Sequence, residues 1–289
     1  MSVAPIPVKI RLRSLPPSAG LSWIRRGLRL FWRRPLGFVG LWLFFTLCVC
    51  MIAFFAVAIS PLVMLAMAAW MPLLSVGFMQ AAAAVLDGQK LRPAVFRTPF
   101  ATTPQAARGM LAIMLIYVVA VALLAVCANA MDGGDTVRWL HAAATPGADG
   151  KPPAIPTMSE ASVSAIRFMM LSLTLISIPL WYVPALVQWG GQGVAQAMFS
   201  SVVALWRTKG AFVVFLFGWA LVGFVFDAIV QVLASVFGTE AMSLAVLTGQ
   251  MVLSISWFLS LWFGFVDTFE INAAAAFQPG KVEGEGDPG

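Results

Sequence analysis

Charge is scarce in this chain: only 10% of its 289 residues are Asp, Glu, Lys or Arg, whereas 61% are hydrophobic. A soluble domain usually carries about 25% charged residues. Because a water-facing surface of this size needs more charged side chains than the chain has, the composition excludes a soluble enzyme. One histidine and three cysteines leave little material for metal binding, disulfide bonds or histidine catalysis.

Long apolar runs make up most of the chain. A helix needs roughly 20 mostly apolar residues to cross a hydrocarbon core about 30 Å thick. Runs of this kind predict an all-α, polytopic membrane helix bundle of about six transmembrane helices and two interfacial amphipathic helices. The predicted spans are residues 36–59, 62–86, 110–127, 163–183, 211–236 and 243–266. In the fourth, Pro179 and Pro184 should kink or end the helix, because proline has no amide hydrogen to donate.

The segments between the spans are too short or too polar to build a separate core. The sequence therefore predicts one membrane domain over residues 21–277, between a cytoplasmic N-terminal tail, 1–20, and a disordered cytoplasmic tail, 278–289. The longest connection, 129–162, is rich in Gly, Pro, Ala and Asp and is expected to be poorly ordered.

The basic residues are distributed unevenly between the two sides that six spans define. One side carries 15 of the 18 lysines and arginines, and it includes both termini. Because cytoplasmic loops collect Lys and Arg, this bias predicts that both termini lie in the cytoplasm. The same topology accounts for the net charge of +6 and argues against nucleic acid as a partner.

Two segments read as amphipathic helices. In 21–34 the arginines 25, 26, 29 and 33 fall within one arc and apolar residues occupy the rest, with Arg34 as the exception. The segment 192–207 is a less charged version. Such a helix is expected to lie in the membrane interface with its apolar face on lipid and its arginines toward anionic headgroups. It serves either as a topology anchor or as a specific headgroup site. The lipid-interface candidates are Arg25, Arg26, Arg29, Arg33, Arg34, Trp32, Trp206 and Arg207.

The two amphipathic segments also suggest an internal repeat. Aligning 31–39 with 205–213 places four identical residues opposite each other. The matches are Trp32 with Trp206, Arg33 with Arg207, Phe38 with Phe212 and Val39 with Val213. Both copies start on the cytoplasmic side, so the repeat is parallel, an arrangement that also occurs in transporters.

Asp227 is an acidic residue well inside a predicted span. Gly223, Asp227, Gln231 and Ser235 recur every four residues, so they share one helix face, which should turn inward. Helical rise puts Asp227 roughly 13 Å below the outer end of its helix and Gln250 about 10 Å below the start of the next. The sequence predicts an Asp227–Gln250 contact, either a structural hydrogen bond or part of a proton or substrate site.

No arrangement of residues supports enzyme chemistry. Asp267, the other candidate for an intramembrane carboxylate pair, lies roughly 35 Å from Asp227 by helical rise. The chain has no HExxH, P-loop or paired CxxC motif, so we expect no catalytic residue, metal or cofactor. Trp181, Tyr182 and Trp189 are expected in an aromatic belt at the membrane surface.

The order of these parts resembles an uncharacterised family of bacterial multi-pass inner-membrane proteins. The residues that carry the resemblance are Ser22-Trp23 through Arg34-Pro35, PLLSVGFMQAAAAVLDGQ (72–89), VPALVQWGGQGVAQAM (183–198), ALWRTKGAFVVF (204–215) and FVDTFE (265–270). The chain is also distantly similar to the membrane domains attached to some bacterial glycerophosphodiesterases. It lacks their soluble catalytic domain, so the resemblance implies a membrane fold and no hydrolase activity.

Two functional hypotheses follow. The first is a non-enzymatic integral membrane protein that scaffolds partners or lipids, with anionic headgroups of the bilayer and another membrane protein as the expected partners. The second is a small transporter or permease subunit that uses the Asp227 face.

Overall fold

The structure is a computed structural model that describes residues 11–59, 69–144 and 157–270. The predicted tail 278–289 and parts of two predicted connections lie outside these residues. The long helices are α2 (Pro35–Ile59), α5 (Pro104–Asp132), α7 (Glu160–Leu180), α10 (Lys209–Phe237) and α11 (Thr239–Thr268). The shorter ones are α1 (Ala19–Arg33), α3 (Trp70–Leu86), η2 (Pro93–Phe96), α4 (Thr98–Ala101), α6 (Asp135–Ala144), α8 (Val183–Gly190) and α9 (Val194–Arg207). The all-α fold class is confirmed.

Five described helices are long and apolar enough to cross a membrane. They are Pro35–Phe54, Pro104–Asp132, Glu160–Gly190, Lys209–Phe237 and Ala241–Thr268. The remaining predicted span, 62–86, falls partly outside the described residues, and its described part is α3, an apolar helix of 17 residues. Nearly every side chain of α3 from Pro72 to Val85 is buried, so this helix packs inside the bundle.

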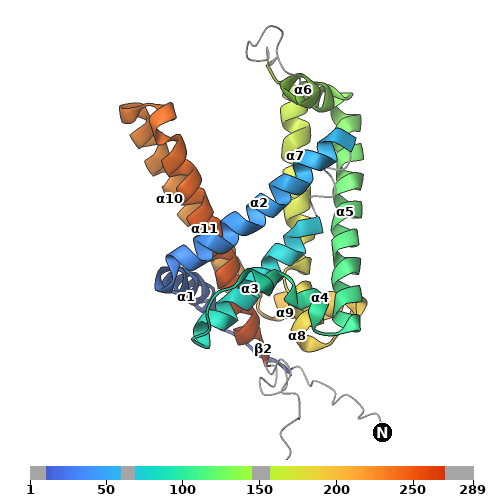
Figure 1. Cartoon of the computed structure of the whole chain (residues 1–289), viewed down its shortest axis with the longest axis vertical. Coiled ribbons are helices and arrows are strands. Elements are labelled where there is room, and N and C mark those ends of the chain that lie inside the picture. The colour runs from blue at the N-terminus through green and yellow to red at the C-terminus, as the bar shows by residue number, and fades with distance from the viewer. Residues whose placement is uncertain (1–10, 60–68, 145–156, 271–289) are drawn as a thin grey trace, which may run out of the picture.

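A short pair of strands joins the two ends of the described chain. β1 (Arg11–Leu12) pairs antiparallel with β2 (Phe269–Glu270), and the side chain of Arg13 donates to Glu270 at 3.2 Å. Within the predicted N-terminal tail, 1–20, Arg11 and Leu12 are held in this pair and α1 begins at Ala19. With α1, α4, α8 and α9, the strands form what we call the basal end of the molecule (Figure 1).

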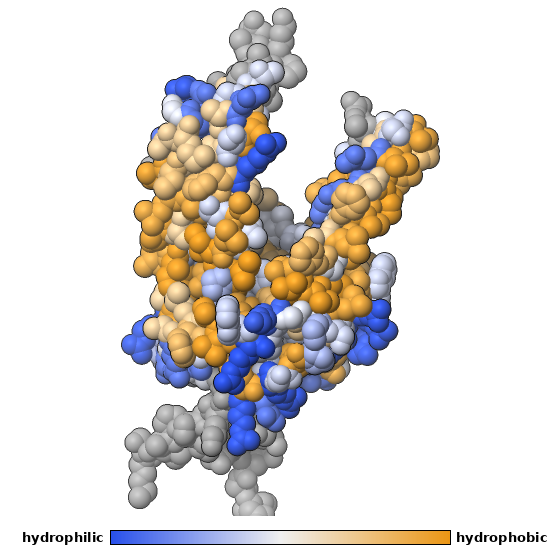
Figure 2. Space-filling view, turned by 180° about the vertical axis from the view of Figure 1, so that it is seen from behind, coloured by the Kyte–Doolittle hydropathy of each residue, from blue (hydrophilic) through white to orange (hydrophobic). Residues whose placement is uncertain are grey.

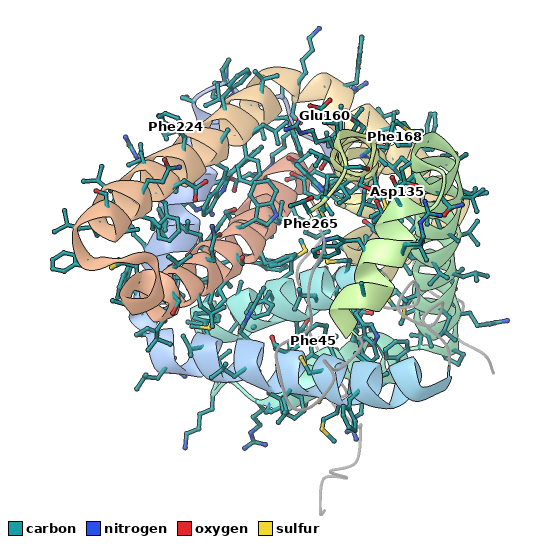
Figure 3. The ribbon with its side chains drawn as sticks, turned by 90° about the horizontal axis from the view of Figure 1, so that it is seen from above. Phe45, Asp135, Glu160, Phe168, Phe224 and Phe265 are labelled. Atoms are coloured by element: carbon teal, nitrogen blue, oxygen red, sulfur yellow. The ribbon has the colours of Figure 1, made fainter. Side chains whose placement is uncertain are left out.

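The helices are arranged as three successive pairs around a centre, as the view from above shows (Figure 3). These pairs are α2 with α3, α5 with α7, and α10 with α11. Each pair packs against short helical segments that come before a different pair in the chain. α1, which precedes α2, packs against α10 and α11; η2 and α4, which precede α5, pack against α3. α9, which precedes α10, packs against α5 and α7. The short helices therefore form a base, from which the α10–α11 arm diverges from the other helices (Figure 1).

The suggested repeat is matched by the positions of the helix ends. α1 ends at Arg33 and α9 ends at the aligned Arg207. After one connecting residue, α2 begins at Pro35 and α10 begins at the aligned Lys209. The two segments thus have the same local plan of an amphipathic helix, a sharp corner and a long apolar helix.

The aligned aromatic side chains also have equivalent surroundings. Trp32 and Trp206 are both exposed, at 68% and 74%, although tryptophan is a large apolar residue. Phe38 and Phe212, one turn into the following helix, are both buried. The corner therefore points a tryptophan outward and a phenylalanine into the core in both halves.

Part of the predicted outer loop is folded. The sequence predicts poor order over 129–162, but Asp135–Ala144 form helix α6. The carboxylate of Asp132 accepts hydrogen bonds from the backbone amides of Gly134, at 2.9 Å, and Thr136, at 2.8 Å. These contacts satisfy amides that the first turn of a helix leaves without partners. The prediction is therefore wrong for this segment.

Candidate functional site

The apolar face of α1 is covered by protein. Trp23, Ile24, Leu30 and Phe31 are each at most 3% exposed and pack against α10 and α11. The approach is close because Gly27 has no side chain: a Cβ there would lie 2.8 Å from Cβ of Ser260. The expectation that this face would lie on lipid is therefore wrong, because two helices of the same chain supply an equally apolar surface.

The polar face of α1 is divided between an internal contact and open surface. Arg26 donates to a carboxylate oxygen of Asp267 at 2.6 Å, and the indole nitrogen of Trp23 donates to the same oxygen at 2.9 Å. Arg25, Arg29 and Arg33 are exposed. Among the described residues these three arginines form no salt bridge, so their charges remain available to a ligand outside the chain.

Asp267 is the functional residue that sequence reasoning missed. The sequence suggests Asp267 only as a partner for Asp227, from which it lies roughly 35 Å away by helical rise. Its actual partners lie 241 and 244 residues away in the chain. The signal that points to them is an acidic residue at the basal end of a span, on the same side of the membrane as an arginine-rich helix.

The corner between α1 and α2 is fixed by a second contact. Arg34 donates to the backbone oxygen of Gln89 at 2.8 Å, which ties the corner to the connection after α3. Trp32 stays exposed beside it. Of the eight lipid-interface candidates, Arg26 and Arg34 are thus engaged with the protein, and the other six face outward.

Helix α9 packs through small residues. Ala197, Ser201 and Ala204 are buried, whereas Val202 is 49% exposed and Trp206 is 74% exposed. Small side chains let a helix approach its neighbours closely. As a result the bulky apolar side chains of α9 are left facing outward, with Arg207 at the end of the helix.

A cavity of about 280 Å³ lies where the three helix pairs meet. Its walls come from α3, α5, α7, α8 and α11 and include the hydroxyl-bearing residues Ser75, Tyr117, Thr174 and Ser177. The remaining lining residues are apolar, and none of the lining residues is charged. The cavity suits a neutral or hydrocarbon group and offers no paired acid and base for catalysis.

Aromatic side chains of α8, of the residue before it and of the end of α11 pack together in the core. Tyr182 and Trp189 are 1% and 6% exposed, and their rings lie 6.0 Å and 5.7 Å from that of Phe265. Phe265 lies near the middle of the bundle when it is seen from above (Figure 3). The predicted place of Tyr182 and Trp189 in a surface belt is wrong, because α8 turns both rings into the core.

The polar face around Asp227 does not turn into the bundle. Asp227, Gln231, Ser235 and Gln250 are all exposed, and the structure describes no hydrogen bond between Asp227 and Gln250. The contact between these helices is apolar instead: a Cβ at Gly249 would lie 2.3 Å from the ring of Phe226. The prediction of an inward face is therefore wrong.

The shape of the molecule explains this exposure. The α10–α11 arm stands apart from the other helices in its upper part, so no third helix covers its sides (Figure 1). Figure 2 shows a hollow between this arm and the α5–α7 pair, with hydrophilic residues on the side of the arm that borders the hollow. In the described ranges, no group of three or more His, Cys, Asp or Glu residues is placed to hold a metal ion.

Comparison with known proteins gives one informative similarity. The chain is 27% identical over 209 residues to a probable inner membrane protein of Burkholderia thailandensis, and the alignment covers 71% of this chain and 74% of that protein. No family model and no solved structure matches the chain. The distant similarity to glycerophosphodiesterase-associated domains stays a prediction. The resemblance to bacterial inner-membrane proteins is confirmed, and the chain is an integral, multi-pass inner-membrane protein.

Proposed function

We propose that this chain is a non-enzymatic membrane protein that gathers anionic phospholipids at its basal end, with that end and both termini in the cytoplasm. The observation that carries the proposal is the outward array of Arg25, Arg29 and Arg33 on α1. The opposite face of α1 is buried in the protein, so the helix cannot rotate or dissociate, and its three guanidinium groups stay directed outward.

The orientation follows from the distribution of charge. The basal end carries α1, the start of α10 and the connections after α3, where the basic residues of the described chain concentrate, and Figure 2 shows hydrophilic residues gathered there. Basic loops face the cytoplasm, and the inner leaflet is the anionic one. Each exposed arginine near such a surface contributes about 1 kcal/mol to lipid attraction.

Native mass spectrometry of the protein in nanodiscs tests the proposal. In an equal mixture of phosphatidylglycerol and phosphatidylcholine, the wild type should retain phosphatidylglycerol preferentially. Changing Arg25, Arg29 and Arg33 together to Gln should reduce that preference by up to about 100-fold, from three contributions of about 1 kcal/mol each. Changing the same residues to Lys keeps the charge and should preserve it. An unchanged preference in the Gln variant would overturn the proposal.

The second candidate function is transport, and the central cavity favours it. The walls of the cavity carry the hydroxyl groups of Ser75, Tyr117, Thr174 and Ser177, and the hollow beside the α10–α11 arm is bordered by hydrophilic residues of that arm (Figure 2). Asp227 is the ionisable residue of α10 that a proton-coupled mechanism would use. Proton uptake into proteoliposomes with a trapped pH dye tests this: uptake should occur in the wild type and be lost in Asp227→Asn, and normal uptake in the variant excludes the mechanism.

A further inference from the structure

We propose that the recess between α7, α9 and α10 binds one phospholipid molecule, with an acyl chain inside it and the phosphate at Lys209 and Arg207. The inference deepens the proposed function, because it takes the basal end to lie at the anionic leaflet. The recess site differs from the arginine array of the proposed function, because the arginines of α1 attract many lipids together, whereas the recess holds a single lipid molecule.

The recess has a volume of about 300 Å³ and lies at the basal end of the apolar surface. Pro179 of α7, Leu205 of α9 and Phe212 and Leu216 of α10 contribute to its walls. Every lining residue except Lys209 is apolar. A cavity of this composition favours a hydrocarbon chain over water, because burying apolar surface is favourable and the walls supply no partner for water.

The recess exists because of how its walls are held. α9 is fixed to the bundle by its buried small residues, among them Ala197 and Ala204, so Val202 and Trp206 are left on the open side. α7 ends at Leu180, just after Pro179, and the chain turns away into α8. The recess is therefore bounded on three sides, by the end of α7, by α9 and by the start of α10.

The charge at the rim selects the class of lipid. The Lys209 ammonium lies 5.0 Å from the centre of the Trp206 ring, an attractive cation–π distance that keeps the amine at the rim. Arg207, two residues earlier in the chain, is exposed, and neither cation forms a salt bridge with a residue that the structure describes. The uncompensated charge of Lys209 at the recess, with Arg207 close to it in the chain, complements a phosphate that is joined to an acyl chain.

The first half of the chain lacks this combination. Pro35 occupies the position that corresponds to Lys209, so the following helix starts without a cation. The buried face of α1 is covered by α10 and α11, whereas bulky residues of α9 remain open. The phospholipid site is thus specific to the corner between α9 and α10, where residues of both helices and Lys209 line the same recess.

Two substitutions separate the roles of the recess and the charge. Val213 lines the recess and is 50% exposed, so Val213→Trp should fill the space that the acyl chain occupies. Val225 lies on the same helix, outside the lining residues, and is 46% exposed, which makes Val225→Trp a matched control. Lys209→Gln leaves the recess open and removes one charge.

Native mass spectrometry after gentle extraction from cell membranes is the experiment. The wild type and Val225→Trp should retain one phospholipid per chain through detergent exchange, and Val213→Trp should lose it. Lys209→Gln should lower the retained fraction of anionic lipid about fivefold, as expected for a contribution of about 1 kcal/mol. Retention in Val213→Trp equal to that in Val225→Trp, or no preference for anionic lipid over neutral lipid at this position, would overturn the inference.

The two proposals fail separately. The Gln variant of Arg25, Arg29 and Arg33 should lose the general preference for phosphatidylglycerol and still retain the single bound lipid. If that variant behaves like the wild type while Val213→Trp loses its lipid, the recess site stands and the arginine array is wrong. If the arginine variant loses the preference and Val213→Trp keeps its lipid, the recess site is wrong.

Discussion

An Asp267→Ala substitution removes the carboxylate that joins the end of α11 to α1. One oxygen of this carboxylate accepts hydrogen bonds from the indole of Trp23 and the guanidinium of Arg26. Trp23 is 1% exposed, so no water replaces the lost acceptor, whereas the Arg26 side chain is 37% exposed and regains water. The two lost bonds therefore have different consequences.

The expected loss of stability is about 1–4 kcal/mol. Leaving the buried indole N–H without an acceptor costs roughly 1–3 kcal/mol. The ion pair, whose side chains are 37% and 28% exposed, contributes no more than about 1 kcal/mol. Arg26 keeps its position 4.2 Å above the centre of the Phe263 ring, which limits the second loss.

Thermal unfolding of the purified protein in detergent measures this difference. A loss of about 1–4 kcal/mol should lower the midpoint by roughly 2–16 °C, taking roughly 2–4 °C per kcal/mol. Asp267→Asn should cost only about 1 kcal/mol, because its amide oxygen still accepts from Trp23. Asp87→Ala, an exposed aspartate at the basal end, is the control. Equal midpoints for Asp267→Ala and Asp87→Ala would refute the reasoning and leave apolar packing alone to hold α1.

Two further predictions concern backbone packing and pH. Gly27→Ala should destabilise the fold by about 1–3 kcal/mol, because the added Cβ would lie 2.8 Å from Cβ of Ser260. Gly40→Ala is the control and should leave the stability unchanged, because no atom lies within 4 Å of its added Cβ. Equal unfolding midpoints for the two variants would contradict the prediction. Hydrogen bonds from Arg138 and Ser159 lower the pKa of Asp135, so its contribution to docking α6 is present at neutral pH and is lost as the pH falls below about 4. The protection factors of the backbone amides of residues 135–144, which compare each exchange rate with the intrinsic rate at the same pH, should therefore fall in acid. Asp135→Asn should show low protection at neutral pH too, and a variant with wild-type protection at both pH values would count against the role of Asp135.

The spans, the fold class and the amphipathic character of α1 were predictable from local patterns. A run of apolar residues such as that of α5 enters a membrane whatever surrounds it, because its backbone hydrogen bonds are internal. A period of 3.6 residues likewise shows that α1 has an apolar and a polar face. Neither pattern shows what the apolar face contacts, since lipid tails and the side chains of α10 and α11 are equally apolar.

The two aspartates of the α10–α11 arm show the same limit for polar residues. The rule that an intramembrane carboxylate turns inward predicts a buried Asp227, but the arm diverges from the bundle and leaves it exposed. Asp267 has no unusual sequence context, yet it receives two hydrogen bonds from α1. Helical rise predicts how far along its helix a residue lies, whereas the direction of its side chain depends on which helices stand beside it.

Composition and charge distribution were enough to predict a polytopic helical membrane protein with a basic side, because each depends on residues close together in the chain. The packing of α1 beneath α10 and α11, the cavity between the three pairs and the recess at Lys209 depend on contacts between segments far apart in the sequence. Inside a membrane these contacts are selected by side-chain shape and a few hydrogen bonds, since apolar surface alone does not favour one neighbour over another. The candidate lipid site therefore depends on the tertiary structure, which brings α7, α9 and α10 together.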